Sequence, residues 1–132
     1  MRNISFALTT EAVRERRKTV TRRLGWLFLK RGDLLQPVVK GQGIKKGEHV
    51  EKIGGPIMVE SVRSERLNRM LDRRQRHTYG IDECIREGFP ELTPEQFALM
   101  FIEHNRDCDL NTPLTRIEFS YVDADAADAA SD

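Results

Sequence analysis

The sequence predicts an α+β fold in which a small, partly open mixed β-barrel is flanked by helices. Segments with alternating apolar residues gather in the first half of the chain, helical spacing of apolar residues takes over in the middle, and one more alternating segment follows. The 132 residues are enough to bury a core without disulfides or metals, so we expect one domain over residues 1–122.

The first half of the chain supplies most of the expected strands. They cover residues 3–8, 18–24, 34–39 and 56–63. Thr9 and Thr10 are expected to cap a short helix that ends near Arg17. A turn is expected at Lys30-Arg31-Gly32-Asp33, and residues 41–47, which are rich in glycine and lysine, are expected to form a loop.

A basic amphipathic helix is expected over residues 65–76. Leu67, Met70 and Leu71 form its narrow apolar stripe, and arginines occupy the other side. Those arginines are Arg66, Arg69, Arg73 and Arg76. Such a row suits contact with nucleic-acid phosphates or a solvated surface equally well.

Two further helices and a final strand are expected in the second half. Residues 79–87 place Ile81, Cys84 and Ile85 at helical spacing, and Gly88 offers a stop. Thr93-Pro94-Glu95-Gln96 predicts a capping box at the start of the next helix. The residues of that helix expected to face a core are Phe97, Met100, Phe101 and His104. Residues 114–122 alternate as a strand.

The charge is unevenly distributed along the chain. Residues 123–132 hold four aspartates and no lysine or arginine, so the rest of the chain carries a net charge of +5 although the whole carries +1. An Asp/Ala segment cannot bury enough apolar surface to become ordered, so we expect a disordered acidic tail. The remaining domain is basic, which suits an anionic or polar partner such as RNA or a modified nucleoside.

Cysteine and histidine spacing gives no support for a metal site. Cys84 and Cys108 form no CxxC pair and are expected to be small buried side chains. His49, His77 and His104 lack paired-ligand spacing, so we predict no metal and no other cofactor. The longest apolar run is far too short to cross a bilayer, and we expect a soluble cytoplasmic protein.

The segment from Arg16 to Arg23 is the most informative part of the chain. It places an amine, hydroxyls and guanidiniums around a single valine, so it is poor core material. As a strand it would be polar and cationic on both faces, a pattern that suits a polar or anionic ligand lying across it. An ordinary solvated edge strand would carry similar residues.

This segment resembles a known family. The pattern Arg16-x-Lys18-x-x-Thr21-x-Arg23, the turn at residues 30–33 and the Arg-Glu-Gly-Phe-Pro stretch at residues 86–90 resemble the ASCH domain over nearly the whole chain except the tail. The resemblance implies a PUA-like β-barrel. The family signature usually begins with glycine where this chain has Arg16, and many members carry glutamate where it has Thr21.

The Lys-Thr-x-Thr-x-Arg form is similar to small bacterial amidohydrolases that remove the acetyl group from N4-acetylcytidine. The resemblance implies that Lys18, Thr21 and Glu87 are the catalytic residues. We expect the neighbouring side chains to bind the substrate. These are Arg17, Arg22, Arg23 and Trp26. Trp26 suits stacking on a base, but also a position in the core or at its rim.

The residue types fit amide hydrolysis on chemical grounds as well. Thr21 can supply a nucleophilic hydroxyl, and Lys18 can act either as the base or, while charged, as an oxyanion donor. Glu87 can pass a proton to the leaving amine, or simply pair with Arg86 or Arg74 on the surface. Because residues three apart in an ideal strand face opposite ways, Lys18 and Thr21 can meet only across a bulge, bend or helix-to-strand junction.

Two other functions stay open from the sequence. A non-catalytic or ribonucleolytic RNA-binding module would use the same cations to hold phosphates and bases. A protein-binding regulator would use the acidic tail as a contact segment. The sequence does not decide between free nucleoside and polymer, which acyl group is removed, or the oligomeric state.

Overall fold

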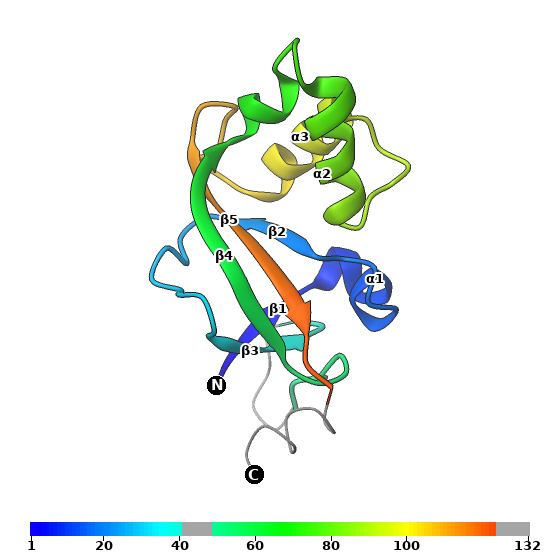
Figure 1. Ribbon diagram of the computed structural model, residues 1–132, viewed down its shortest axis with the longest axis vertical. Helices are drawn as coiled ribbons and strands as arrows, with labels where there is room; N and C mark the ends of the chain where they lie inside the picture. The colour runs from blue at the N-terminus through cyan, green and yellow to red at the C-terminus, as the bar shows by residue number, and fades with distance from the viewer. Residues whose placement is uncertain (41–48, 124–132) are drawn as a thin grey trace.

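The computed structural model describes residues 1–40 and 49–123, apart from the side chain of Arg76, and it has the expected α+β class (Figure 1). The elements in chain order are β1 (Arg2–Ser5), α1 (Thr10–Arg14), β2 (Val20–Arg23), β3 (Leu34–Val38), β4 (Ile57–Arg66), α2 (Ile81–Arg86), α3 (Pro94–His104) and β5 (Pro113–Tyr121). Short helical turns lie at Ala7–Thr9, Leu67–Leu71 and Arg76–Gly80. The expected loop at 41–47 and the acidic tail beyond Asp123 lie outside the described residues.

The five strands form one mixed sheet in the order β1-β3-β4-β5-β2. β1 and β3 are parallel, and the other neighbours are antiparallel. In the described part of the chain the sheet is not closed into a barrel, so β1 and β2 are its two outer strands. A register shift between Val59 and Ser61 places a bulge in β4, and bulges bend a strand and increase its twist.

Two separate apolar clusters form the core. The first lies between the sheet, α1 and the loop residues beside them, and it contains Ile4, Phe6, Val13, Leu29, Leu35, Ile53, Ile57, Val59, Ile117 and Phe119. The second joins α2 and α3 to the far ends of β4 and β5, and it contains Leu67, Met70, Cys84, Phe97, Ala98, Phe101, Cys108 and Leu114. Figure 1 shows α2 and α3 grouped at one end of the sheet and β1 and β3 at the other.

Local signals set the boundaries of several elements as expected. Thr93 caps α3, because its hydroxyl accepts from the backbone N–H of Gln96 while the Gln96 side chain accepts from the backbone N–H of Thr93. The turn after β2 closes where the Asp33 carboxylate accepts from the backbone N–H of Lys30, at 2.8 Å. The predicted strands at both ends of the chain are also present, although β1 stops at Ser5, three residues early.

The predicted basic helix over residues 65–76 is wrong. Glu65 and Arg66 belong to β4, where Arg66 pairs with Pro113 of β5. A short 3-10 turn at Leu67–Leu71 follows, and residues 76–80 form a π-helical turn. Pairing with a strand almost fifty residues away outweighs the local helical spacing of apolar residues. A short-range sequence pattern cannot reveal such a long-range pairing.

The expected apolar face of α2 is also different. Ile81 and Ile85 are exposed at 42% and 50%, whereas Glu83 and Cys84 are buried. The helix therefore turns an acidic side chain inward. Its burial is explained by arginine partners on the sheet, which are described below.

Two residues in left-handed backbone conformations shape the approach to β2. Arg16 has φ +60°, a left-handed conformation that a residue with a Cβ tolerates less well than glycine does. Gly88 follows α2 with φ +93°, and a Cβ added there would lie 3.0 Å from the Ala12 Cβ. The exit from α2 therefore packs closely on α1.

We predict that Gly88→Ala lowers the free energy of unfolding by about 2 kcal/mol, because the new methyl group adds a close contact to an unfavourable backbone conformation. Gly32→Ala is the matched control, since Gly32 also has φ +93° but has no atom within 4 Å of the added Cβ. It should cost about 1 kcal/mol. Urea denaturation measures both values. Equal losses would mean that the contact with Ala12 adds nothing.

Candidate active site

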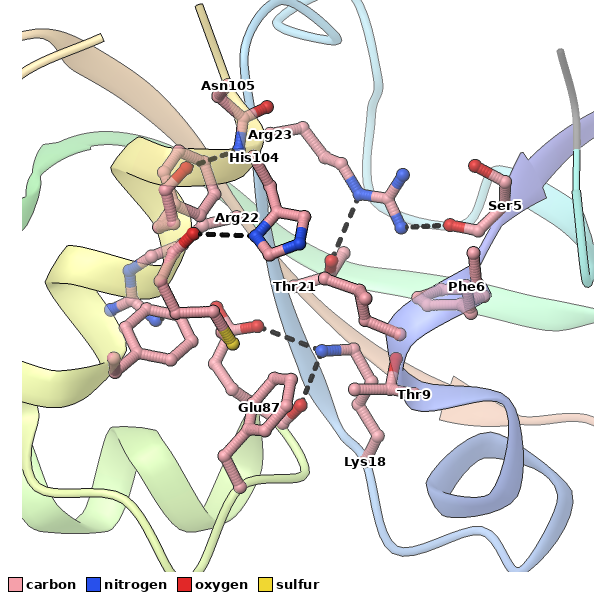
Figure 2. A pocket seen from close by; sticks show the side chains of 16 residues that line it. Ser5, Phe6, Thr9, Lys18, Thr21, Arg22, Arg23, Glu87, His104 and Asn105 are labelled. Carbon is pink, nitrogen blue, oxygen red and sulfur yellow. Dashed lines mark hydrogen bonds and ion pairs between the residues drawn. The ribbon is translucent and has the colours of Figure 1, made fainter.

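The candidate site is a cavity of about 270 Å³ between the two apolar clusters. Phe6 of the first cluster lines it on one side, and Phe97 and Phe101 of the second line it on the other. Polar side chains from β2 and from the end of α2 complete the wall. Figure 2 shows Lys18, Thr21 and Glu87 pointing into this space. The remaining residues that line it are Ser5, Ala7, Leu8, Thr9, Arg22, Arg23, Phe89, Met100, His104 and Asn105.

Lys18 reaches the cavity from the junction between α1 and β2. β2 begins at Val20, so Lys18 precedes the strand and the alternation of strand faces does not apply to the pair Lys18 and Thr21. The junction is fixed by backbone hydrogen bonds, with the Thr19 N–H donating to the Arg86 carbonyl at 2.8 Å and the Phe119 N–H donating to the Thr19 carbonyl at 2.9 Å. These bonds attach the residue beside Lys18 to the end of α2 and to β5.

The Lys18 amine is buried and bound to Glu87. Its Nζ donates to the backbone carbonyl of Glu87 at 2.5 Å and to the carboxylate at 2.9 Å, and both side chains are almost fully shielded from solvent. Burial lowers the pKa of Lys18 from its ordinary value of 10.5, and the charge of Glu87 opposes this shift without cancelling it. The amine therefore loses its proton more readily than an exposed lysine.

Glu87 is the C-cap residue directly after α2, close to the end of the helix expected over residues 79–87. Its second carboxylate oxygen accepts from Arg22 at 3.0 Å, so the carboxylate lies between two cations. It does not make the surface pairs with Arg86 or Arg74 that the sequence also allowed. Arg86 instead pairs with Asp82 and Glu118.

Arg22 is the centre of a buried ionic network. It donates to Glu65 at 2.8 Å and to Glu83 at 2.5 Å in addition to Glu87. Although burial disfavours its charge, the carboxylates of Glu87 and Glu83 raise the pKa of Arg22 above its ordinary value. Arg22 lies opposite Arg116 in the β2–β5 ladder, and like charges in that position repel.

Glu83 relieves this repulsion. Its two carboxylate oxygens accept from Arg116 at 2.6 and 2.9 Å, and one of them also accepts from Arg22. Burial alone would raise the pKa of Glu83, but the hydrogen bonds from Arg116 and the charge of Arg22 lower it to about 2. In the described residues, buried cations and buried carboxylates are equal in number. They are Lys18, Arg22, Arg116, Glu65, Glu83 and Glu87.

Thr21 and Arg23 form the other side of the polar wall. The Arg23 Nε donates to the Thr21 hydroxyl oxygen at 3.1 Å, and a terminal nitrogen of Arg23 donates to the Ser5 carbonyl at 2.5 Å. Arg23 therefore spans from β2 to β1, the two outer strands of the open sheet (Figure 2). Its donation to the Thr21 oxygen leaves the hydroxyl proton of Thr21 for a different acceptor.

Two of the expected substrate-binding residues lie outside the cavity. Arg17 is about half exposed and pairs with Glu15 at 3.2 Å, because the strand begins only after it. Trp26 has φ +70° in the connection after β2, stacks on Phe28 and packs against the first apolar cluster. Trp26 therefore lies at the rim of the core, one of the positions that the sequence allowed.

The four arginines expected to contact nucleic acid are divided, because the helix predicted to carry them does not form. Arg66 donates to the Asn111 carbonyl at 2.8 Å, and Arg69 lies 4.9 Å above the Tyr79 ring. Both line a second groove together with Arg63. Arg73 is exposed in a turn, and the side chain of Arg76 lies outside the described residues.

Sequence reasoning missed several residues of the cavity and its network. His104 was expected to face the core, but it is exposed and lines the cavity, with its Nδ1 2.9 Å from the Met100 carbonyl. A carbonyl can only accept, so Nδ1 carries the proton and Nε2 is an acceptor in the neutral ring. Asn105 follows it at the cavity, and its amide donates to the Phe101 carbonyl at 2.8 Å.

Other reactive groups do not extend the site. Cys84 and Cys108 are free and buried, and burial raises the pKa of Cys84 to about 11. Within residues 1–40 and 49–123, no group of three or more His, Cys, Asp or Glu side chains is placed to hold a metal ion. No helix in those ranges is long and apolar enough to cross a membrane.

Comparison with solved structures identifies a similar fold. The chain superimposes on a point mutant of ZmASCH from Zymomonas mobilis with a TM-score of 0.53 and 16% sequence identity, covering 96% of this chain and 78% of that one. The fold is ASCH-like. At this identity the likeness concerns the fold alone, which agrees with the resemblance seen in the sequence. No protein-family model matches the chain, and no curated protein matches it either.

We predict that ionisation of the Glu83 carboxyl makes the stability of the fold depend on pH. Because its pKa is lowered from 4.5 to about 2, its contribution is complete above pH 4.5 and is lost as the pH falls towards 2. Glu83→Gln should be less stable at pH 7 and should lose less on acidification. Thermal unfolding from pH 7 to pH 2 measures this. Glu91→Gln, at an exposed position, is the control and should unfold like the parent protein. If Glu83→Gln loses as much stability on acidification as the parent protein does, the stabilising role assigned to the ionised Glu83 is wrong.

Proposed function

We propose that the protein is an amidohydrolase that removes an acyl group from N4 of an acylated cytidine or a related modified nucleoside. One observation carries the proposal. Lys18 and Thr21 belong to one short segment and Glu87 comes from a distant part of the chain, yet each is only 3% exposed and all three line the same cavity. A nucleophile, a base and a proton carrier need mutual access to one substrate, and a shared cavity supplies it.

In the proposed reaction the Thr21 hydroxyl attacks the amide carbon. Its proton passes to the neutral amine of Lys18, the carbon–nitrogen bond breaks, and the cytidine amine leaves with a proton relayed through Lys18 and Glu87. Water then hydrolyses the threonine ester, which returns the hydroxyl to Thr21 and releases the carboxylic acid. The lowered pKa of Lys18 supports its role as the base.

Arg23 is suited to position and activate the nucleophile. Its N–H donates to the Thr21 oxygen, which orients the hydroxyl and favours negative charge on that oxygen. Arg22 holds the opposite side of the site, because it fixes the Glu87 carboxylate that Lys18 contacts. Both are positioning residues in this proposal.

The size and lining of the cavity support a small, flat substrate. A volume of about 270 Å³ is slightly below the usual range for drug-sized ligands, about 300–1,000 Å³, so a single base or nucleoside is a suitable occupant. Phenylalanines form much of the wall and can contact a base through their faces or edges. They are Phe6, Phe89, Phe97 and Phe101.

RNA binding is the second candidate function, and the arginine-lined groove favours it. The guanidiniums of Arg63, Arg66 and Arg69 lie along the end of β4 and the turn that follows, where they can contact successive phosphates. The Arg63 side chain is half exposed. This groove has a different lining from the cavity, so RNA binding does not require the residues proposed for hydrolysis.

We predict that the purified protein releases cytidine from N4-acetylcytidine, and that Lys18→Ala and Thr21→Ala each lower kcat/KM by at least about 100-fold, because each removes a group that takes part in bond formation. Liquid chromatography of the products measures the reaction. Thr21→Ser keeps a hydroxyl and should retain part of the activity. Lys30→Ala, at an exposed position, is the control for the lysine and should match the parent protein.

A different result would favour the second function. If the protein leaves N4-acetylcytidine intact but retards RNA in a gel, and Arg66→Ala and Arg69→Ala reduce that retardation, the hydrolase proposal is wrong and the groove is the functional surface. RNA cleavage in the same samples would indicate a ribonuclease. Circular dichroism of each variant establishes that it is folded.

The pH dependence of the reaction distinguishes the two roles of Lys18. If Lys18 is the base, kcat/KM rises with pH as the amine loses its proton, and it levels off below pH 10.5 because the pKa of Lys18 is lowered. If Lys18 acts as a charged oxyanion donor, kcat/KM falls over the same range. We predict the rise, and we predict that Lys18→Arg, which stays charged, loses it.

A further inference from the structure

Arg23 differs from the other cations that line the cavity. Lys18 is paired with one carboxylate and Arg22 with three. Arg23 donates to two neutral oxygens, the Thr21 hydroxyl and the Ser5 carbonyl, and makes no ion pair with a carboxylate in the described part of the chain. When Lys18 is protonated, the three buried cations and three buried carboxylates of the ionic network balance without Arg23, so Arg23 then adds one positive charge to the cavity wall.

The Arg23 guanidinium is partly shielded from water. Burial lowers the pKa of Arg23 to about 10, and the more distant charge of Glu87 compensates only in part. The guanidinium lies 4.9 Å from the centre of the Phe6 ring, which removes water from one of its faces. A shielded cation is stabilised strongly by an anion that contacts it.

The Arg23 guanidinium also has N–H groups that take no part in these two hydrogen bonds. Of its five N–H groups, one on Nε points to Thr21 and one on a terminal nitrogen points to Ser5. Three N–H groups remain for other acceptors at the cavity. Phosphate and carboxylate groups match this planar arrangement, because two of their oxygens can accept from one guanidinium.

We propose that the ligand of this cavity carries an anionic group, either a phosphate on the sugar or a carboxylate on the acyl chain, and that Arg23 binds it. The inference rests on the proposed function for the rest of the ligand. It narrows the substrate class from a neutral modified nucleoside to an anionic one. Arg23 would then bind substrate in addition to positioning Thr21.

Three substrates test the inference. They are N4-acetylcytidine, which is neutral, its 5′-monophosphate, and N4-succinylcytidine, which carries a carboxylate on the acyl group. We expect kcat/KM to be at least about tenfold higher for one of the two anionic substrates, since hydrogen bonds between a guanidinium and an anion are stronger than those between neutral groups. The favoured substrate identifies which anionic group is recognised. Equal kcat/KM values for all three would overturn the inference and leave the hydrolase proposal intact.

Variants show whether Arg23 is responsible. In Arg23→Gln the ratio of kcat/KM between anionic and neutral substrate should fall to about one, and a ratio cancels any common loss caused by a misplaced Thr21. Arg23→Lys keeps the charge and should retain part of the preference. Arg17→Gln is the matched control, because Arg17 lies outside the cavity, and its ratio should be unchanged. A preference that persists in Arg23→Gln would assign the anion to another residue.

A binding measurement keeps the inference testable if none of the substrates is hydrolysed. Calorimetry with cytidine and with cytidine 5′-monophosphate should then show tighter binding of the monophosphate to the parent protein, with the difference lost in Arg23→Gln. Because this experiment uses no turnover, failure of the hydrolase proposal and failure of the anion inference give different results. Equal affinities for these two ligands, together with equal affinities for N4-acetylcytidine and N4-succinylcytidine, would overturn the inference. If Arg23→Gln does not fold, the comparison in the parent protein and in Arg23→Lys decides.

Discussion

The contact of Arg22 with three carboxylates is the interaction on which the site depends. Glu65 lies near the end of β4, Glu83 lies within α2, and Glu87 is the C-cap residue of α2. The Arg22 guanidinium therefore connects the sheet to the helical end of the molecule. Removing one partner from a buried ionic pair costs about 3–5 kcal/mol. The position of the Glu87 carboxylate, and with it the bond to Lys18, follows from this arrangement. The space between the two apolar clusters is therefore bordered by fixed charges rather than filled by side chains.

Elements set by local chemistry could be read from the sequence. The capping box of α3, the Lys30–Asp33 turn and the alternation in β5 each depend on residues within a few positions of one another. The basic helix over 65–76 could not be rejected in this way, because what prevents it is the pairing of β4 with a strand nearly fifty residues later. The inward face of α2 was missed for a related reason, since Glu83 is buried only by virtue of arginines on β2 and β5.

The candidate site was predictable where a motif was continuous and unpredictable where it was assembled by the fold. Lys18, Thr21 and Arg23 belong to one short pattern, and the structure brings them to the same cavity with Glu87. Their chemical roles remain proposals. His104, however, follows a regular helical pattern and gave no sign that it would line a cavity. Arg17 and Trp26 looked equivalent to the cavity residues in the sequence, but the late start of β2 and the left-handed conformation at Trp26 direct them elsewhere.

The open sheet exposes the protein to aggregation through its two edge strands. A sheet that does not close leaves unpaired main-chain groups along its outer strands, and such margins readily recruit a strand from another molecule. Here the margin formed by β2 carries Arg23, which reaches across to the carbonyl of Ser5 on the opposite margin, whereas the neighbouring Arg22 is buried. Charged side chains at such margins discourage intermolecular β-pairing. In our proposal Arg23 also binds the ligand, so ligand recognition and protection of the sheet edge depend on one side chain, which limits how freely either property can change alone.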